Sequence, residues 1–171
     1  MNKLVVLLFL GVLFSGATGY KDLRRKEVKN VVEAKCGTAE TNWKPCIPKN
    51  VVNRLFRSCC HQFVPKECHQ LCTYDTDHIS ARRTLIDIVK QHKCSLKYMS
   101  SILYCASQNR DNRKCCMDLG LNSPSLQVGS QCLKMCDLSN GDMKTLSLND
   151  VTCLYNWNVL MYCHHSGIKE L

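Results

Sequence analysis

Apolar residues recur at helical spacing through much of this chain. The first helical stripe follows Pro48 and contains Val51, Val52, Leu55, Phe56, Cys59 and Cys60. Pro65 is well placed to begin a short second helix that carries Cys68, Leu71 and Cys72 on one side. No segment alternates apolar and polar residues as a half-buried strand would. The pattern therefore predicts an all-α fold.

Two more helices are expected after a turn at residues 73–77. The first is marked by Ile79, Leu85, Ile86 and Val89. Ser95 is expected to cap the second, in which Met99, Ile102, Leu103 and Ala106 recur at helical spacing.

The second half of the chain repeats this plan in shorter form. A helix with Cys115 and Cys116 is expected to end near Gly120. The last helix is expected to begin at a cap formed by Asn149 or Asp150 and to stop at Gly167. Its inner positions are Cys153, Leu154, Trp157, Leu160, Met161 and Cys163.

Cysteine spacing repeats in the same order as the helices. The first set is Cys59, Cys60, Cys68, Cys72, Cys94 and Cys105, and the second is Cys115, Cys116, Cys132, Cys136, Cys153 and Cys163. Cys36 and Cys46 stand in front and bring the count to fourteen. We interpret the chain as a disulfide-rich helical module built from two pseudo-repeats, at residues 59–105 and 115–163.

Geometry restricts how these cysteines can pair. Adjacent cysteines strain badly if joined, and cysteines at i and i+4 point in parallel. If Cys94 and Cys105 share one helix, they lie roughly 16 Å apart, too far for a bond. Each half then has three elements with two cysteines apiece, and each element is bridged once to both of the others. About eight pairings per half stay open, and Cys36 is expected to bond Cys46.

Residues 1–19 have the features of a secretory signal peptide. Lys3 supplies a positive start, a short apolar run follows, and Ala17-Thr18-Gly19 offers small residues for cleavage. The apolar run is too short to span a bilayer, which needs about 20 apolar residues. We expect a secreted chain with no membrane span, formed of a basic segment with the first helix and the extra cysteine pair (20–58), a cysteine-rich domain (59–163) and a C-terminal tail (164–171).

The formal net charge of +9 points to anionic partners. Much of the excess precedes the first cysteine, and the candidate residues for anionic contact are Lys21, Arg24, Arg25, Lys26 and Lys29. A heparin-type patch is one interpretation, and the solvated face of a short helix is the simpler one. Arg24-Arg25 is also a candidate processing site. Exchanging these charges is expected to weaken retention on heparin.

Catalytic and metal-binding patterns are weak, and we expect neither an enzyme nor a cofactor. The pair Cys59-Cys60 followed by His61 has a distant likeness to phospholipase A2, but the acidic neighbour and the calcium loop are missing. Zinc is the alternative to disulfides, with Cys68-His69 and His164-His165 as ligands. We expect instead that His61, His164 and His165 are surface residues.

The cysteines and their neighbours resemble one known family. The matching residues are Cys59-Cys60, Val64-Pro65, Cys68, Leu71-Cys72, Tyr74-Asp75, Cys94, Cys105-Ala106, Cys115-Cys116, Cys132, Cys136, Cys153 and Cys163. This spacing is similar to the DB module, a secreted cysteine-rich domain abundant in nematodes. The resemblance implies an extracellular module with six bridges and no established general activity. The chain departs from it in Cys36, Cys46 and Val128-Gly129-Ser130, and in having no companion domain.

Two classes of function fit these observations. We favour a secreted binding or signalling module that presents a rigid helical surface to an extracellular or cell-surface protein, with anionic glycans as a second partner class. The alternative is a carrier of lipid or another small apolar molecule. Nucleic acid is not an expected partner.

Overall fold

The computed structural model describes residues 36–91, 93–126, 128–139 and 146–171. Helices connected by short loops make up this region, and its elements follow in one list. They are η2 (Ala39–Thr41), α2 (Lys49–Phe63), η3 (Lys66–Leu71), α3 (His78–Lys90), η4 (Leu96–Tyr98), α4 (Met99–Ser107), α5 (Arg113–Asp118), η5 (Pro124–Leu126), η6 (Gln131–Cys136), η7 (Leu148–Asn156) and α6 (Trp157–Ser166), where η marks a 3₁₀ helix. No strand forms among the described residues, so the expectation of a helical fold is confirmed there.

Helix α2 forms on the predicted stripe. Val52, Phe56 and Cys60 are fully buried at i, i+4 and i+8. The neighbouring positions Leu55 and Cys59 are half-buried, so the buried face is narrower than the sequence pattern suggests. The helix stops where Val64 becomes extended before Pro65, because a residue that precedes proline disfavours the α conformation.

The two C-x-x-x-C segments are 3₁₀ helices and not α-helices. Pro65 lies at the N-cap of η3 and not at its first position. With three residues per turn, Cys68 and Leu71 share the buried side, and Cys72 lies beyond the helix end. Cys132 and Cys136 both lie within η6, with Cys136 as its last residue, and both are buried.

Helix α3 buries a face that matches the predicted one only in part. Leu85 is buried as predicted, but Ala81 and Ile88 enter the core with it, whereas Ile79 is 67% exposed. The spacing of Ala81, Leu85 and Ile88 is also helical, but a small alanine gives a weak signal in an apolar pattern.

Two helix starts also differ from expectation. Ser95 precedes a 3₁₀ turn, η4, and its hydroxyl makes no capping bond. The predicted last helix is divided into the 3₁₀ helix η7 and the α-helix α6, and the N-cap of η7 is Ser147, not Asn149 or Asp150. The Asp150 carboxylate accepts from the Ser147 backbone N–H at 2.8 Å, which closes a capping box. Gly167 ends α6 as predicted.

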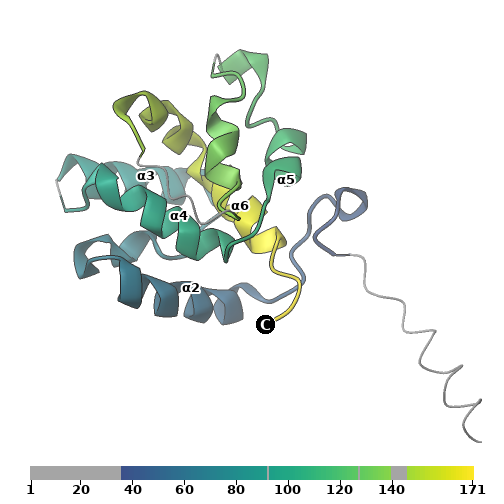
Figure 1. Cartoon of the computed structure of the whole chain (residues 1–171), viewed down its shortest axis with the longest axis horizontal. Helices are drawn as coiled ribbons and strands as arrows, with labels where there is room; N and C mark the ends of the chain where they lie inside the picture. The colour runs from purple at the N-terminus through teal and green to yellow at the C-terminus, as the bar shows by residue number, and fades with distance from the viewer. Residues whose placement is uncertain (1–35, 92, 127, 140–145) are drawn as a thin grey trace, which may run out of the picture. The chain divides into compact units, whose positions relative to one another are not determined.

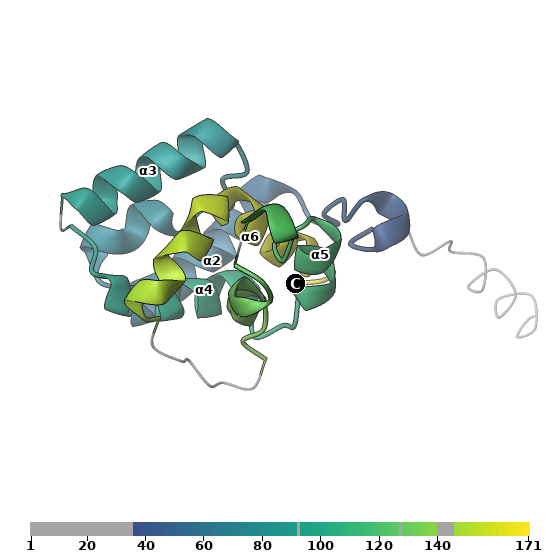
Figure 2. The same cartoon turned by 90° about the horizontal axis from the view of Figure 1, so that it is seen from above.

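Helix α6 lies in the middle of the other helices in both views (Figures 1 and 2) and contacts α3, α4 and α5. Trp157, Leu160 and Met161 fill the core from this helix. Helices α2 and α4 pack side by side (Figure 1). Beyond α6, Ile168 is also fully buried, so the C-terminal segment completes the core.

A bilayer crossing needs a long apolar helix, and the described part of the chain contains none.

Two phenylalanines on α2 test this packing. Phe56→Ala is expected to lower the free energy of unfolding by about 3 to 5 kcal/mol, because it empties a fully buried site. Phe63→Ala, the control at a 53% exposed position of the same helix, is expected to change it by less than about 0.5 kcal/mol. Urea unfolding with the disulfides intact measures both, and equal losses would contradict the placement of Phe56.

Candidate functional site

Seven disulfides connect all fourteen cysteines, and no cysteine is free. The bridges are Cys36–Cys46, Cys59–Cys105, Cys60–Cys72, Cys68–Cys94, Cys115–Cys163, Cys116–Cys136 and Cys132–Cys153. In each set of six, the adjacent pair, the C-x-x-x-C pair and the last two cysteines are joined pairwise, as the geometric argument predicts. The premise that the last two cysteines share one helix was wrong, because Cys94 lies before η4 and Cys105 in α4, while Cys153 lies in η7 and Cys163 in α6.

Most of these cysteines have a structural role in the core. Cys60, Cys68 and Cys72 are 0% exposed, and so are Cys105, Cys116, Cys132, Cys136, Cys153 and Cys163. Cys59 is only half-buried and reaches the surface between α2 and α4. So many bridges fit an oxidising, extracellular-type environment.

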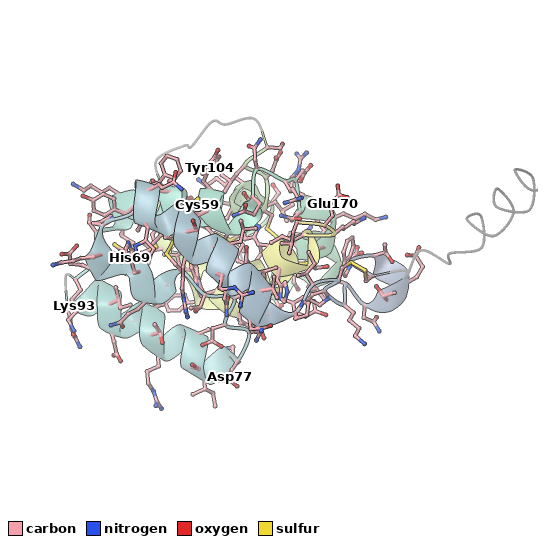
Figure 3. The ribbon with its side chains drawn as sticks, turned by 90° about the horizontal axis from the view of Figure 1, so that it is seen from below. Cys59, His69, Asp77, Lys93, Tyr104 and Glu170 are labelled. Atoms are coloured by element: carbon pink, nitrogen blue, oxygen red, sulfur yellow. A yellow bond between two sulfur atoms is a disulfide. The ribbon has the colours of Figure 1, made fainter. Side chains whose placement is uncertain are left out.

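A surface groove lies where Cys59 is accessible. It has a volume of about 340 Å³, and its lining includes Leu55, Phe63 and Tyr104. The Phe63 and Tyr104 rings meet edge to face, with centroids 6.1 Å apart. Figure 3 shows Cys59 and Tyr104 close together at this face. An exposed aromatic edge of this kind is typical of protein contact sites.

Helix α2, which forms one wall of this groove, is basic. It carries Lys49, Arg54 and Arg57 and has no acidic residue along its length. Arg54 and Arg57 are exposed and make no ion pair with another described residue. Sequence reasoning missed the groove, because Phe63 lies beyond the predicted apolar stripe and Tyr104 comes from a separate helix. We call Phe63 and Tyr104 with the groove the α2–α4 face.

The N-terminal residues proposed for anionic contact lie outside the described residues. They are Lys21, Arg24, Arg25, Lys26 and Lys29. The signal peptide and the Arg24-Arg25 processing site also fall outside them.

The histidines at the end of α6 are buried, so the prediction that they are exposed is wrong. His164 is 0% exposed; its Nε2 donates to the Met135 carbonyl at 3.1 Å, and its Nδ1 accepts from the Asn112 amide at 3.0 Å. His165 is 4% exposed, donates from Nε2 to the Ile47 carbonyl at 2.7 Å, and stacks on Tyr74. The Asn112 amide that donates to Nδ1 favours the neutral ring of His164.

Burial sets the proton affinity of these groups. It lowers the pKa of His164 to about 4, although the bond to the Met135 carbonyl opposes the shift. Burial also lowers the pKa of His165 and raises the pKa of Tyr74, whose hydroxyl donates to the Ala106 carbonyl at 2.7 Å. These groups tie α6, α4 and the segment before α2 together.

His61 is exposed as expected, although it lies within α2 and not after it. The centroid of its ring lies 4.5 Å from that of His69, and His69 Nε2 donates to the Val64 carbonyl at 2.8 Å. Among the described residues, no three His, Cys, Asp or Glu side chains gather as metal ligands would.

These features define a disulfide-rich helical domain. The family model of the DB module matches residues 58–164, which is more than half of the chain. The protein therefore belongs to the DB module family, as the cysteine spacing indicated. Neither a curated protein nor a solved structure matches the chain.

Two disulfides with similar loop lengths test the importance of burial. Cys36–Cys46 and Cys60–Cys72 close loops of 10 and 12 residues, so the loss of chain constraint is about 3 kcal/mol for either. Cys60→Ala/Cys72→Ala also leaves a void in the core and is expected to cost more than Cys36→Ala/Cys46→Ala. Urea unfolding of both double variants measures the difference, and equal costs would contradict it.

Acid is expected to destabilise the domain through His164. Its folded pKa lies below the ordinary value, so its contribution is full above about pH 6.5 and is lost as the pH falls toward 4. Between pH 7.0 and 4.5 the free energy of unfolding should fall by about 2 to 3 kcal/mol from this group alone. Denaturant titrations at the two pH values measure this loss.

His164→Gln is the matched control, because an amide can donate to Met135 and accept from Asn112 without titrating. The loss should be smaller in that variant. An unchanged pH dependence would show that His164 does not cause it.

Proposed function

We propose that this protein is a secreted binding module that engages an extracellular or cell-surface protein through its α2–α4 face, rather than an enzyme. The observation that carries this proposal is that two helices joined by a disulfide, α2 and α4, present exposed aromatic side chains at the same place. The Cys59–Cys105 bridge joins α2 to α4 directly beneath Phe63 and Tyr104. A surface that is already ordered before the partner binds loses less conformational entropy on binding.

The chemistry of this face suggests the character of the partner. Phe63 supplies an apolar anchor that is 53% exposed, and aromatic anchors contribute strongly to binding when a partner covers them. The basic residues of α2 favour an acidic partner, because complementary charge speeds association. The proposed partner is therefore an acidic protein with an apolar pocket.

We also propose that the module consists of two pseudo-repeats and is exported by its first nineteen residues. Support for the repeats comes from the equal order of bridges in the two sets, including separations of 46 and 48 residues for Cys59–Cys105 and Cys115–Cys163. Support for export comes from the residue pattern at the start of the chain and from the number of disulfides.

A pairwise screen of the protein against receptor ectodomains tests the function. We expect at least one specific partner, with affinity reduced about tenfold or more by Phe63→Ala, as for a central aromatic anchor. Ile79→Ala, at a 67% exposed apolar position on α3, is the matched control and should leave binding unchanged. A protein that binds no ectodomain but yields stoichiometric lipid on extraction would overturn the proposal in favour of a carrier.

A further inference from the structure

A second recess lies at the junction of the Cys36–Cys46 loop, the start of α5 and the end of α6. Its volume is about 440 Å³, and its lining includes Trp43, Arg110, Lys114 and Lys169. Lys114 and Lys169 are exposed, whereas Arg110 is half-buried. Three cations and one indole ring thus border a single hollow.

The carboxylate that lines this recess is already paired. Asp111 accepts from the Arg113 guanidinium at 2.6 Å, and Arg113 also contacts Asp137 at 3.2 Å. The bond to Arg113 lowers the pKa of Asp111, so the carboxylate stays charged and directed at that partner. Arg110, Lys114 and Lys169 make no ion pair within the described residues. The recess therefore has an excess of positive charge available to a ligand.

The indole is held in place from several sides. Trp43 Nε1 donates to Asp118 Oδ2 at 3.1 Å, and the Tyr162 hydroxyl donates to the Asn42 carbonyl at 3.0 Å. The Cys36–Cys46 bridge closes the loop that carries Trp43. Because its edge is bound and its loop is closed, the ring is a preordered platform.

Two glycines let the wall of the recess pack closely. Gly37 has a φ of +64°, and a side chain there would meet the Ser166 carbonyl. A side chain at Gly167 would overlap the amide of Asn112. Both glycines line the recess, so the Cys36–Cys46 loop and Asn112 are held close to the end of α6 and the wall is fixed before a ligand binds.

We propose that this recess binds an anionic sugar of a sulfated glycan. The three cations would neutralise sulfate or carboxylate groups, and the indole face would pack against the apolar face of a sugar ring. This proposal assigns a glycan-binding site to the folded domain, and the site does not require the candidate residues at positions 21–29. The proposal deepens the binding function but does not use the α2–α4 face, so either site can fail while the other stands.

The two tryptophans of the chain provide a local readout. Trp157 is 2% exposed, so the change in acrylamide quenching on ligand binding reports mainly on Trp43. Titration with a heparin tetrasaccharide should protect Trp43 from acrylamide in the unaltered protein. Protection should persist when Lys21, Arg24, Arg25, Lys26 and Lys29 are all replaced by Gln.

The decisive variant is Arg110→Gln/Lys114→Gln/Lys169→Gln, with Arg54→Gln/Arg57→Gln/Lys66→Gln as a control of equal charge change on exposed residues. We expect the first to weaken tetrasaccharide affinity tenfold or more and the control to change it less than threefold. Equal losses in the two variants would overturn the proposal, because binding would then depend on net charge alone. If the first variant does not fold, the proposal is tested by the unaltered protein alone. Absence of Trp43 protection by the tetrasaccharide would then overturn it.

Further titrations distinguish a sulfated glycan from other sources of the anion. Inorganic sulfate at the same sulfate concentration and a fully desulfated tetrasaccharide should give little protection. If inorganic sulfate protects as well as the tetrasaccharide, or if phosphatidylserine vesicles protect Trp43 and the tetrasaccharide does not, a sulfated glycan is not the ligand.

Discussion

Disulfide geometry is the constraint on which the rest of this structure depends. Adjacent cysteines strain badly if joined, and cysteines four apart on one element point in parallel, so each bonds a different element. Around Cys60 the consequence is direct: Cys59 reaches α4 while Cys60 reaches the segment after η3. A single helix is thus fixed in two directions by neighbouring residues, and a small set of short helices becomes one rigid body.

Buried polar side chains complete what the bridges begin. Tyr74 stacks on the ring of His165 and contacts the ring of Phe56, and its hydroxyl donates to the Ala106 carbonyl. His164 joins Asn112 to Met135 in the same region. Because each of these groups has its hydrogen-bond partners, they specify one arrangement of the helices instead of penalising it.

Sequence patterns were sufficient to place most of the helices along the chain and to predict the closed pairing of the cysteines, because both follow largely from local geometry. They failed where a distant segment decides the outcome. His164 and His165 stand at a helix end, which is commonly exposed, but residues 42–47 and Ile168 cover that end. Ser147 was missed for another reason: the local spacing Ser147-x-x-Asp150 is that of a capping box, but Asp150 was assigned as a candidate for the cap itself. The groove and the recess could not be foreseen, since each combines residues from several elements.

The family match begins at residue 58, yet the folding unit extends further toward the N-terminus. The carbonyls of Asn42 and Ile47 accept from Tyr162 and His165, and Gly37 lies against Ser166. A fragment trimmed to the matched span would lose both acceptors and uncover the last turn of α6. The Cys36–Cys46 loop and the segment after it therefore cover the C-terminal end of α6. A fragment designed to contain the folded module must include them.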